Sequence, residues 1–314
     1  MKMVIIEPLG VEEGKLLAMA REALGDRVEI VYYNTKTTDT AELIERGKDA
    51  EIIVVSNLPL NVQVIEGCRN LKLLAVAFTG VDHIAMDVCR KNGVMVCNCA
   101  GYSTAAVADL VFGLLISLYR RIPACDAAVR REGTKDGLIG FELEGKKFGI
   151  VGAGAIGSRV AAIAQAFGCE VYAYSRTKKD LPGVRFVDLD TLLETCDIVS
   201  LHTPLSEQTR GLIGRDQLAK MKQSAMLINT ARGPVVDSQA LADALSSGRI
   251  AGAGIDVFES EPPIAADHPL LGAPNLLATP HVAFATREAL IKRAHIAFEN
   301  IAAYLKGTPQ NLIP

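Results

Sequence analysis

Three ionisable side chains in the second half of the chain, Arg232, Glu261 and His281, have the types needed to bind and reduce an organic acid. An arginine guanidinium pairs bidentately with a carboxylate, and a histidine can transfer a proton near neutral pH. A glutamate beside that histidine would favour the imidazolium and fix its orientation. With the nucleotide-binding loop described next, these groups indicate hydride transfer to a 2-oxo acid, the histidine supplying the proton.

A glycine-rich loop, Gly152–Gly157 with the sequence GAGAIG, precedes these residues. In dinucleotide-binding proteins the first glycine permits a tight turn, the second a close approach of the pyrophosphate, and the third close helix–strand packing. Here an apolar, strand-like segment (147–151) comes before the loop and a helical pattern (156–167) overlaps its end, which is the context that the motif requires. We therefore predict a dinucleotide site, and a tight turn without a ligand is the alternative.

The segment after the next expected strand bears on the choice between NAD and NADP. NAD-binding proteins commonly place an acidic residue there to accept hydrogen bonds from the ribose 2′-hydroxyl. This chain has no acidic residue between Tyr174 and Asp180. Arg176 could instead pair with a 2′-phosphate, and Lys178 or Lys179 would add positive charge. We predict a preference for NADP(H), with NAD(H) possible and a solvated basic turn as the non-functional interpretation.

Each of the three ionisable candidates follows a strand-like segment by a few residues. Because parallel sheets bind ligands beyond the carboxyl ends of their strands, we expect all three at one sheet edge. We assign Arg232 to the substrate carboxylate and carbonyl, and His281 to acid–base catalysis assisted by Glu261. His202 also follows a strand, and we expect it to line the cofactor side. The remaining histidines, which lie outside such motifs, are His83, His268 and His295.

Apolar strand-like runs alternate with helical patterns along the whole chain, which predicts parallel sheets covered on both faces. The expected strands cover residues 4–6, 28–33, 52–55, 71–77 and 94–97, and then 148–151, 171–174, 198–201, 225–229, 252–257 and 276–278. Two such series predict an α/β protein with two doubly wound parallel-sheet domains, a flavodoxin-like substrate domain and a Rossmann cofactor domain. We expect residues 1–100 and 286–314 to form the discontinuous substrate-binding domain, and 101–285 the dinucleotide-binding domain. A long apolar helix is expected over 103–122.

Composition excludes several classes of function. A net charge of −3 gives no electrostatic case for binding nucleic acid or an anionic membrane. The longest clear apolar run, 110–118, is too short to span a bilayer, and a strand-like segment begins at once after Met3, leaving no room for a signal peptide. Seven scattered cysteines favour reduced thiols and a cytoplasmic location, and the Cys97-Asn98-Cys99 spacing suits neither zinc nor a redox pair. We expect no metal site.

The ordered motifs of the chain resemble those of the NAD(P)-dependent D-2-hydroxyacid dehydrogenases over nearly its whole length. The motifs are Thr79–Asp82, Tyr102–Ala108, Gly152–Gly157, His202–Leu205, Asn229–Gly233, Asp256–Pro262 and Pro280-His281. The resemblance implies that Arg232, Glu261 and His281 form the catalytic set and that the product has the D configuration. It also implies a homodimer formed through the cofactor domain.

The resemblance further implies which residues bind the cofactor and the substrate. Asp256 would hold the nicotinamide carboxamide, and backbone N–H groups around Thr79 and Gly80 would bind the substrate carboxylate together with Arg232. Combined with the loop and the basic turn above, the expected cofactor site consists of Thr104, Gly152, Gly154, Ala155, Ile156, Gly157, Ser175, Arg176, Thr177, His202, Thr203, Pro204, Thr230, Ala231 and Asp256.

The substrate side chain is expected to be short and uncharged. Leu58, Phe78, Tyr102 and Phe284 would form an apolar pocket, with ordinary core packing as the alternative. Phosphoglycerate-oxidising relatives use arginines near the third strand, whereas residues 55–59 contain no basic residue here, and no regulatory C-terminal domain follows. Formate-oxidising relatives carry glutamine in place of the glutamate, so Glu261 disfavours that reaction.

The leading hypothesis is therefore a reductase of hydroxypyruvate, glyoxylate, pyruvate or a somewhat larger 2-oxo acid. One alternative is a D-lactate-type dehydrogenase that strictly uses NAD. Another is a dinucleotide-sensing binding protein of the corepressor kind.

Overall fold

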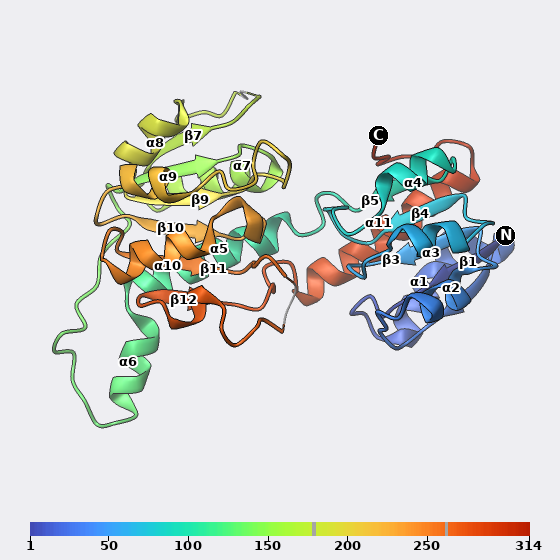
Figure 1. Cartoon of the computed structure of the whole chain (residues 1–314), viewed down its shortest axis with the longest axis horizontal. Coiled ribbons are helices and arrows are strands. Elements are labelled where there is room, and N and C mark those ends of the chain that lie inside the picture. The colour runs from blue at the N-terminus through green and yellow to red at the C-terminus, as the bar shows by residue number, and fades with distance from the viewer. Residues whose placement is uncertain (178–179, 261–262) are drawn as a thin grey trace. The chain divides into compact units, whose positions relative to one another are not determined.

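The computed structural model describes residues 1–177, 180–260 and 263–314, which divide into two compact units (Figure 1). Unit 1 consists of Met1–Ser103 and Ala285–Pro314, and unit 2 of Thr104–Phe284. Each unit is built on a parallel sheet, which confirms the predicted α/β class with two parallel-sheet domains. The roles that we assign to the two units remain predictions.

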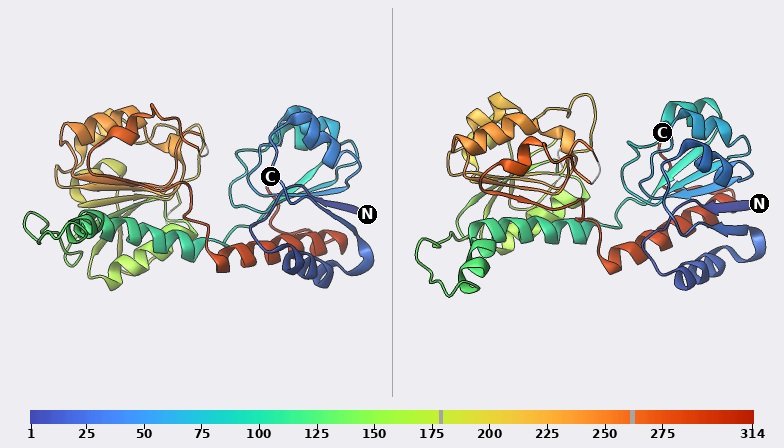
Figure 2. Two further views of the ribbon diagram at one scale, coloured as in Figure 1. Left: turned by 90° about the horizontal axis from the view of Figure 1, so that it is seen from below. Right: turned by 60° about the horizontal axis from the view of Figure 1, so that its bottom comes forward.

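Unit 1 contains a five-stranded parallel sheet in the order β2-β1-β3-β4-β5. Helices α1 and α11 pack together on one face of this sheet, and α2, α3 and α4 lie on the other (Figure 2). The strands are β1 (Lys2–Ile5), β2 (Glu29–Tyr32), β3 (Ile52–Val55), β4 (Leu73–Val76) and β5 (Met95–Asn98). The helices are α1 (Glu13–Leu24), η1 (Gly25–Arg27), α2 (Thr40–Gly47), α3 (Val62–Gly67), α4 (Met86–Lys91) and α11 (Arg287–Leu305).

Unit 2 contains a seven-stranded parallel sheet in the order β12-β11-β10-β9-β6-β7-β8. Helices α5 and α7 cover one face and α8, α9 and α10 the other (Figure 2). The strands are β6 (Lys147–Val151), β7 (Glu170–Tyr174), β8 (Val184–Phe186), β9 (Ile198–Leu201), β10 (Met226–Asn229), β11 (Gly252–Ile255) and β12 (Leu276–Ala278). The helices are α5 (Thr104–Tyr119), α6 (Ile122–Val129), α7 (Ala155–Ala166), α8 (Leu189–Thr195), η2 (Gly233–Val235), α9 (Arg215–Lys220), α10 (Ser238–Ser246) and η3 (Pro269–Gly272).

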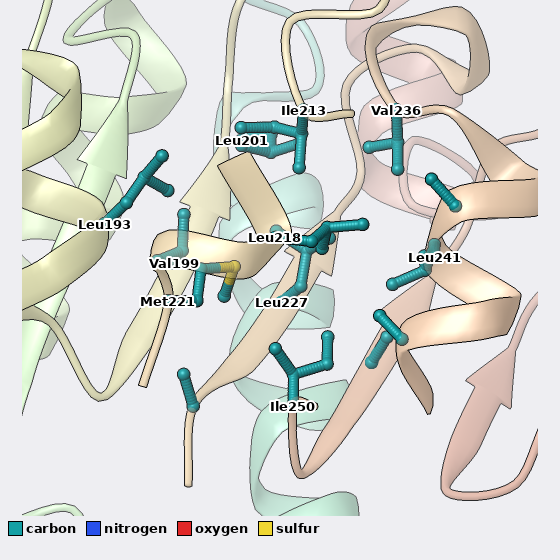
Figure 3. Packing of buried hydrophobic residues seen from close by; sticks show 14 of the residues in the cluster. Leu193, Val199, Leu201, Ile213, Leu218, Met221, Leu227, Val236, Leu241 and Ile250 are labelled. Atoms are coloured by element: carbon teal, nitrogen blue, oxygen red, sulfur yellow. The ribbon is translucent and has the colours of Figure 1, made fainter. Parts of the chain in front are cut away.

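The core of unit 2 explains why its central strands are mostly apolar. On one face Val199 and Leu227 pack with Leu218 and Leu241 from α9 and α10 (Figure 3). On the other face Ile198 and Ile228 belong to a second buried cluster with residues of α5 and α7. Side chains that point to either face of β9 and β10 are thus buried. Burial of each such aliphatic side chain stabilises the folded state by roughly 1.5–3 kcal/mol.

Most expected elements agree with the structure within two residues, and the exceptions have local causes. The helix expected over 103–122 ends at Tyr119, because Arg121 adopts a left-handed conformation (φ 52°), and a separate helix, α6, begins at Ile122. Within that margin, the strand expected over 252–257 ends at Ile255, where the Asp256 carboxylate binds a neighbouring loop. Strand β8 gave no signal, since it is a short edge strand.

The structure also describes the state of the cysteines, the length and polarity of the helices and the grouping of possible metal ligands. All seven cysteines are free, and Cys97 and Cys99 are both buried, with burial raising the pKa of each thiol to about 12. Across the described ranges, no helix is both long and apolar enough to cross a membrane. Within the same ranges, no group of histidine, cysteine and acidic side chains could hold a metal ion.

Candidate functional site

The carboxyl edge of the unit 2 sheet carries, in a row, most of the predicted site residues of this unit. Following the sheet from β12 to β7, the segments beyond the strand ends contain His281, Asp256, Arg232, His202, Gly152 and Ser175 in turn. Strand order reverses next to β6, because the chain continues from β6 to β7 on one side and returns to β9 on the other. Such a switch point is where open parallel sheets bind ligands.

The three glycines of the nucleotide loop have different steric surroundings. Gly152 has φ 103°, and a Cβ there would lie 2.7 Å from the His202 carbonyl oxygen. A Cβ at Gly157 would overlap the Gly152 carbonyl oxygen, whereas one at Gly154 would meet nothing within 4 Å. Gly154 therefore borders open space at the N-cap of α7, where no side chain caps the helix. This arrangement fits the pyrophosphate of a dinucleotide, which helix N-terminal N–H groups attract.

The loop forms part of a pocket shared with the ends of β7 and β9. Arg176 is the sole charged side chain among the described residues that line it. The lining residues are Gly152, Ala153, Gly154, Tyr174, Ser175, Arg176, Thr177, His202, Thr203, Pro204, Ser206, Gln208, Thr209 and Leu212. The structure thus brings together the glycine loop, Ser175–Thr177 and the His202–Pro204 motif, which are separated in the sequence. Lys178 and Lys179 lie outside the described residues.

Two threonines predicted to line the cofactor site have unused hydroxyl groups. Thr203 follows β9 and Thr230 follows β10, and each Oγ1 is buried. In the described part of the chain neither Oγ1 has a hydrogen-bond partner. Buried hydroxyls normally have one, so both are available to a ligand at this edge. The other predicted residues nearby are Ala231, on the same turn as Thr230, and Thr104, at the start of α5.

Arg232 stands on a turn that a buried asparagine fixes. The Asn229 side chain accepts a hydrogen bond from Ala231 N (3.0 Å) and donates one to the Arg232 carbonyl (2.9 Å). Gly233 packs so closely on Phe258 that a Cβ there would overlap the Phe258 carbonyl group. These contacts fix the backbone of the turn at Arg232. We did not identify Asn229 as functional from the sequence, although a polar residue that ends an apolar strand was the available signal.

His281 is held in a strained backbone conformation by Asp256. Its φ is 55°, and its N–H donates to the Asp256 carbonyl at 2.8 Å. The fully buried Asp256 carboxylate accepts from Val282 N, Ala283 N and Thr279 Oγ1 (2.9, 2.9 and 2.6 Å). Burial raises the pKa of Asp256, and these hydrogen bonds oppose the rise. Both carboxylate oxygens thus bind the His281 loop, a role additional to the carboxamide contact that we predict.

The ring of His202 is buried and is unsuited to carrying a proton. Its Nε2 lies 2.9 Å from Ser200 Oγ, and burial of the ring lowers the pKa of His202 to about 3 although the residue is only half-buried overall. The ring is consequently neutral at physiological pH. This favours the cofactor-side position predicted for His202 over a role in proton transfer.

The remaining acidic candidate, Glu261, lies outside the described residues. The connection that contains it does include another acid–histidine pair, Glu259 and His268, whose side chains approach to 2.9 Å. Phe284 stacks edge-on against His281, with ring centroids 5.4 Å apart. Phe284 is thus placed beside the predicted acid–base group.

The other predicted substrate-binding residues follow strands of unit 1. Thr79 and Gly80 come after β4, and the Asn98 side chain donates to the Thr79 carbonyl at 2.6 Å. Phe78 and Tyr102 are buried with ring centroids 6.2 Å apart. Leu58, which is also buried, follows β3. These residues share the carboxyl edge of one sheet.

Comparisons with known proteins agree with this arrangement. Residues 112–283 match the family described as D-isomer specific 2-hydroxyacid dehydrogenase, NAD binding domain. A hydroxypyruvate reductase from Blautia hydrogenotrophica is 36% identical, over 100% of this chain and 99% of that protein. A glyoxylate reductase from Korarchaeum cryptofilum is 40% identical, over 86% and 85%. A solved structure of an acyclic imino acid reductase (Bsp5), in complex with NADPH and D-Arg, is 33% identical over 100% of both chains, with a TM-score of 0.91.

These matches confirm the resemblance inferred from the motifs. The chain belongs to the D-isomer-specific 2-hydroxyacid dehydrogenase family and is an NAD(P)-dependent oxidoreductase of that family.

Proposed function

We propose that the protein reduces short 2-oxo acids, such as hydroxypyruvate, glyoxylate or pyruvate, to the corresponding D-2-hydroxy acids. The observation that carries this proposal is the row of residues at the unit 2 sheet edge. Arg232 and His281 follow β10 and β12, which flank β11, and the nucleotide loop follows β6 in the same sheet. The names of the hydroxypyruvate and glyoxylate reductases that share 36% and 40% identity with this chain support the substrate class.

The proposed roles follow from the charge that develops during reduction. The nicotinamide cofactor, when bound, supplies the hydride. The Arg232 guanidinium binds the substrate carboxylate, with the N–H groups near Thr79 and Gly80, and stabilises negative charge on the carbonyl oxygen. Protonated His281 donates a proton to that oxygen, and Glu261 stabilises the imidazolium beforehand. In the oxidation direction, neutral His281 removes the hydroxyl proton.

The cofactor is proposed to be NADPH in preference to NADH. Arg176 lines the pocket beyond β7 together with Ser175 and Thr177, and the described lining residues include no acid that would repel a 2′-phosphate. The NADPH bound by the imino acid reductase of similar fold is consistent with this preference. We expect Arg176→Ala to raise KM for NADPH by about tenfold or more, because a charge-assisted contact is lost, and to leave KM for NADH nearly unchanged. Equal effects on both cofactors would contradict this assignment.

One assay tests the reaction itself. The purified protein is mixed with NADPH or NADH and a panel of glyoxylate, hydroxypyruvate, pyruvate, 2-oxoisocaproate and phenylpyruvate, and oxidation of the reduced nicotinamide is followed by absorbance. We expect rapid turnover with NADPH and a short 2-oxo acid, and chiral chromatography should identify the D product. Turnover with NADH alone would support the D-lactate-type alternative. Binding of a dinucleotide without turnover of any acid would favour the corepressor-like alternative.

The protein is further proposed to form a homodimer through unit 2. No residue of α6 is buried, and α6 extends away from the sheet with the loop that follows it (Figure 1). Exposed apolar side chains in this region are Ile122, Val129, Ile139 and Phe141. Such a group of exposed apolar side chains is typical of a surface covered by a second copy. Val129→Asp with Ile139→Asp should yield monomers in sedimentation velocity, whereas an unchanged dimer would place the interface elsewhere.

A further inference from the structure

A buried charged cluster lies in unit 1, apart from the row of residues in unit 2. Glu7, directly after β1, is 0% exposed, and Arg293, on α11, is 3% exposed. Ser56, after β3, joins them: its backbone N–H donates to Glu7 Oε1 (2.7 Å), and its Oγ accepts from Arg293 Nη1 (2.9 Å). Charged side chains are rarely buried unless they are paired with an opposite charge or hydrogen-bonded to neighbouring groups. The cluster therefore requires a structural or functional reason.

The contacts of the cluster fall on residues predicted to shape the substrate pocket. Glu7 Oε1 also accepts from the backbone N–H of Leu58 at 3.0 Å. The Arg293 guanidinium lies over the ring of Tyr102, 5.6 Å from its centroid, and donates to the Leu9 carbonyl at 2.7 Å. Leu58 is thus fixed through its backbone and Tyr102 through one face of its ring.

The second carboxylate oxygen of Glu7 faces a lysine from another loop. Glu7 Oε2 has no hydrogen-bond partner among the described residues and lies 3.6 Å from Lys36 Nζ. Lys36 Nζ is in turn 3.4 Å from Asn57 Oδ1. Residues 56–58 are therefore held on three sides, by Glu7, by Arg293 and by Lys36. The sequence around the third strand shows no basic residue, so these cations become visible only in the fold.

We propose that Glu7 is a positioning residue that determines selectivity for the substrate side chain. It does so by fixing the loop Ser56–Leu58, and Arg293 secures the same loop from α11. This inference rests on the proposed function, because it concerns which 2-oxo acids the site accepts. Leu58 can discriminate between a short and a bulky side chain only if its backbone is held, since an apolar side chain on a free loop yields to a larger ligand. The proton transfer assigned to His281 does not involve this cluster.

The test compares three variants with matched chemistry. Glu7→Ala removes the acceptor for both N–H groups, Glu7→Gln keeps the Oε1 acceptor but not the charge, and Ser56→Ala removes only the acceptor of Arg293. The control is Glu51→Gln, at the amino edge of the same sheet, where Glu51 binds Lys2 N and Lys72. For each variant, kcat and KM are measured with glyoxylate and with phenylpyruvate, the pH profile of kcat is recorded, and thermal unfolding establishes that the protein is folded.

We expect Glu7→Ala to change the ratio of kcat/KM for glyoxylate over phenylpyruvate by about tenfold in favour of the bulky acid, as expected when buried N–H groups lose their acceptor. The change should appear mainly in KM, with the pH profile of kcat unaltered. Ser56→Ala should change the ratio in the same direction by a smaller factor. Glu7→Gln and Glu51→Gln should leave it within about twofold of the unsubstituted protein, since the acceptor remains in the first and lies elsewhere in the second.

An unaltered ratio in folded Glu7→Ala and Ser56→Ala would overturn the inference, as would an equal loss of kcat/KM for both acids. If Glu7→Ala does not fold, the ratio of kcat/KM for the two acids in folded Ser56→Ala is the test. Absence of turnover of any 2-oxo acid by the unsubstituted protein is a separate result, which refutes the proposed function before any variant is compared.

Discussion

The carboxyl edges of the two sheets are constructed alike but present different chemistry. In each unit a buried polar side chain at or just after a strand end fixes a neighbouring loop: Glu7 and Asn98 in unit 1, Asn229 and Asp256 in unit 2. In unit 2 these anchors hold Arg232 and His281, which are ionisable. In unit 1 they hold Leu58 and Thr79, which would offer an apolar side chain and backbone groups. The same kind of buried polar anchor would thus serve the proposed acid–base chemistry at one sheet edge and the proposed substrate recognition at the other.

Removing the proposed acid–base group should have the largest effect on activity. His281→Ala should lower kcat by roughly 10²–10⁴-fold, because a positioned general acid contributes a factor of that size. KM for the 2-oxo acid should change far less. His295→Ala is the matched control, since His295 lies on α11 with an exposed side chain. Steady-state kinetics decide, and a fully active His281→Ala protein would refute the assignment.

Replacing the proposed carboxylate-binding group should have the next largest effect. Arg232→Ala is expected to raise KM for the 2-oxo acid and to lower kcat. The combined loss in kcat/KM should be on the order of 10²-fold or more, because a bidentate charge-assisted contact is lost where carbonyl charge develops. Arg215→Ala serves as control, since Arg215 forms a surface pair with Asp243. A loss of cofactor affinity alone would show that Arg232 binds the cofactor, which would contradict its proposed role in substrate binding.

Replacing a buried residue that fixes a loop should reduce activity less than replacing the proposed catalytic residue on that loop. Asp256→Asn directs an amide N–H group toward at least one of the donors Val282 N, Ala283 N and Thr279 Oγ1, so the strained His281 loop should relax. We expect kcat to fall by about tenfold, since the hydrogen bonds that position His281 are lost. Asp243→Asn, on the surface, is the control. Unchanged kinetics in a folded Asp256→Asn protein would show that the hydrogen bonds of the Asp256 carboxylate do not position His281 for turnover.

The smallest expected effect concerns stability rather than turnover. The folded-state pKa of His202 is lowered to about 3 by burial, so the unfolded chain binds this proton first as the pH falls. The contribution of His202 to stability is therefore complete above the ordinary histidine pKa and is lost progressively as the pH falls toward about 3. His202→Asn should flatten the decline of the melting temperature on acidification, whereas His295→Asn, at an exposed position, should not. Parallel curves for His202→Asn and the unsubstituted protein would contradict this.

Much of the fold could be predicted because its signals are local. Strand β3 has the residue range expected from the apolar pattern, since a strand buried on both faces must be apolar throughout. The glycine loop was likewise predictable, because its spacing between a strand-like segment and a helical pattern is visible along the chain. Edge strand β8 and the break between α5 and α6 were missed, since an exposed three-residue strand and a left-handed Arg121 leave no pattern.

By itself, the sequence determined which segments become strands and helices and which polar residues follow strand ends, because these depend on hydrophobic periodicity and on side chains close along the chain. Only the tertiary structure decided which strand ends are neighbours, that Asp256 holds the His281 loop, and that Glu7 and Arg293 meet at Ser56. Ser56 and Arg293 are separated by 237 positions. Their contact arises when a parallel sheet sets strand ends side by side and a helix from the far end of the chain packs on it, and no local pattern encodes such a pairing.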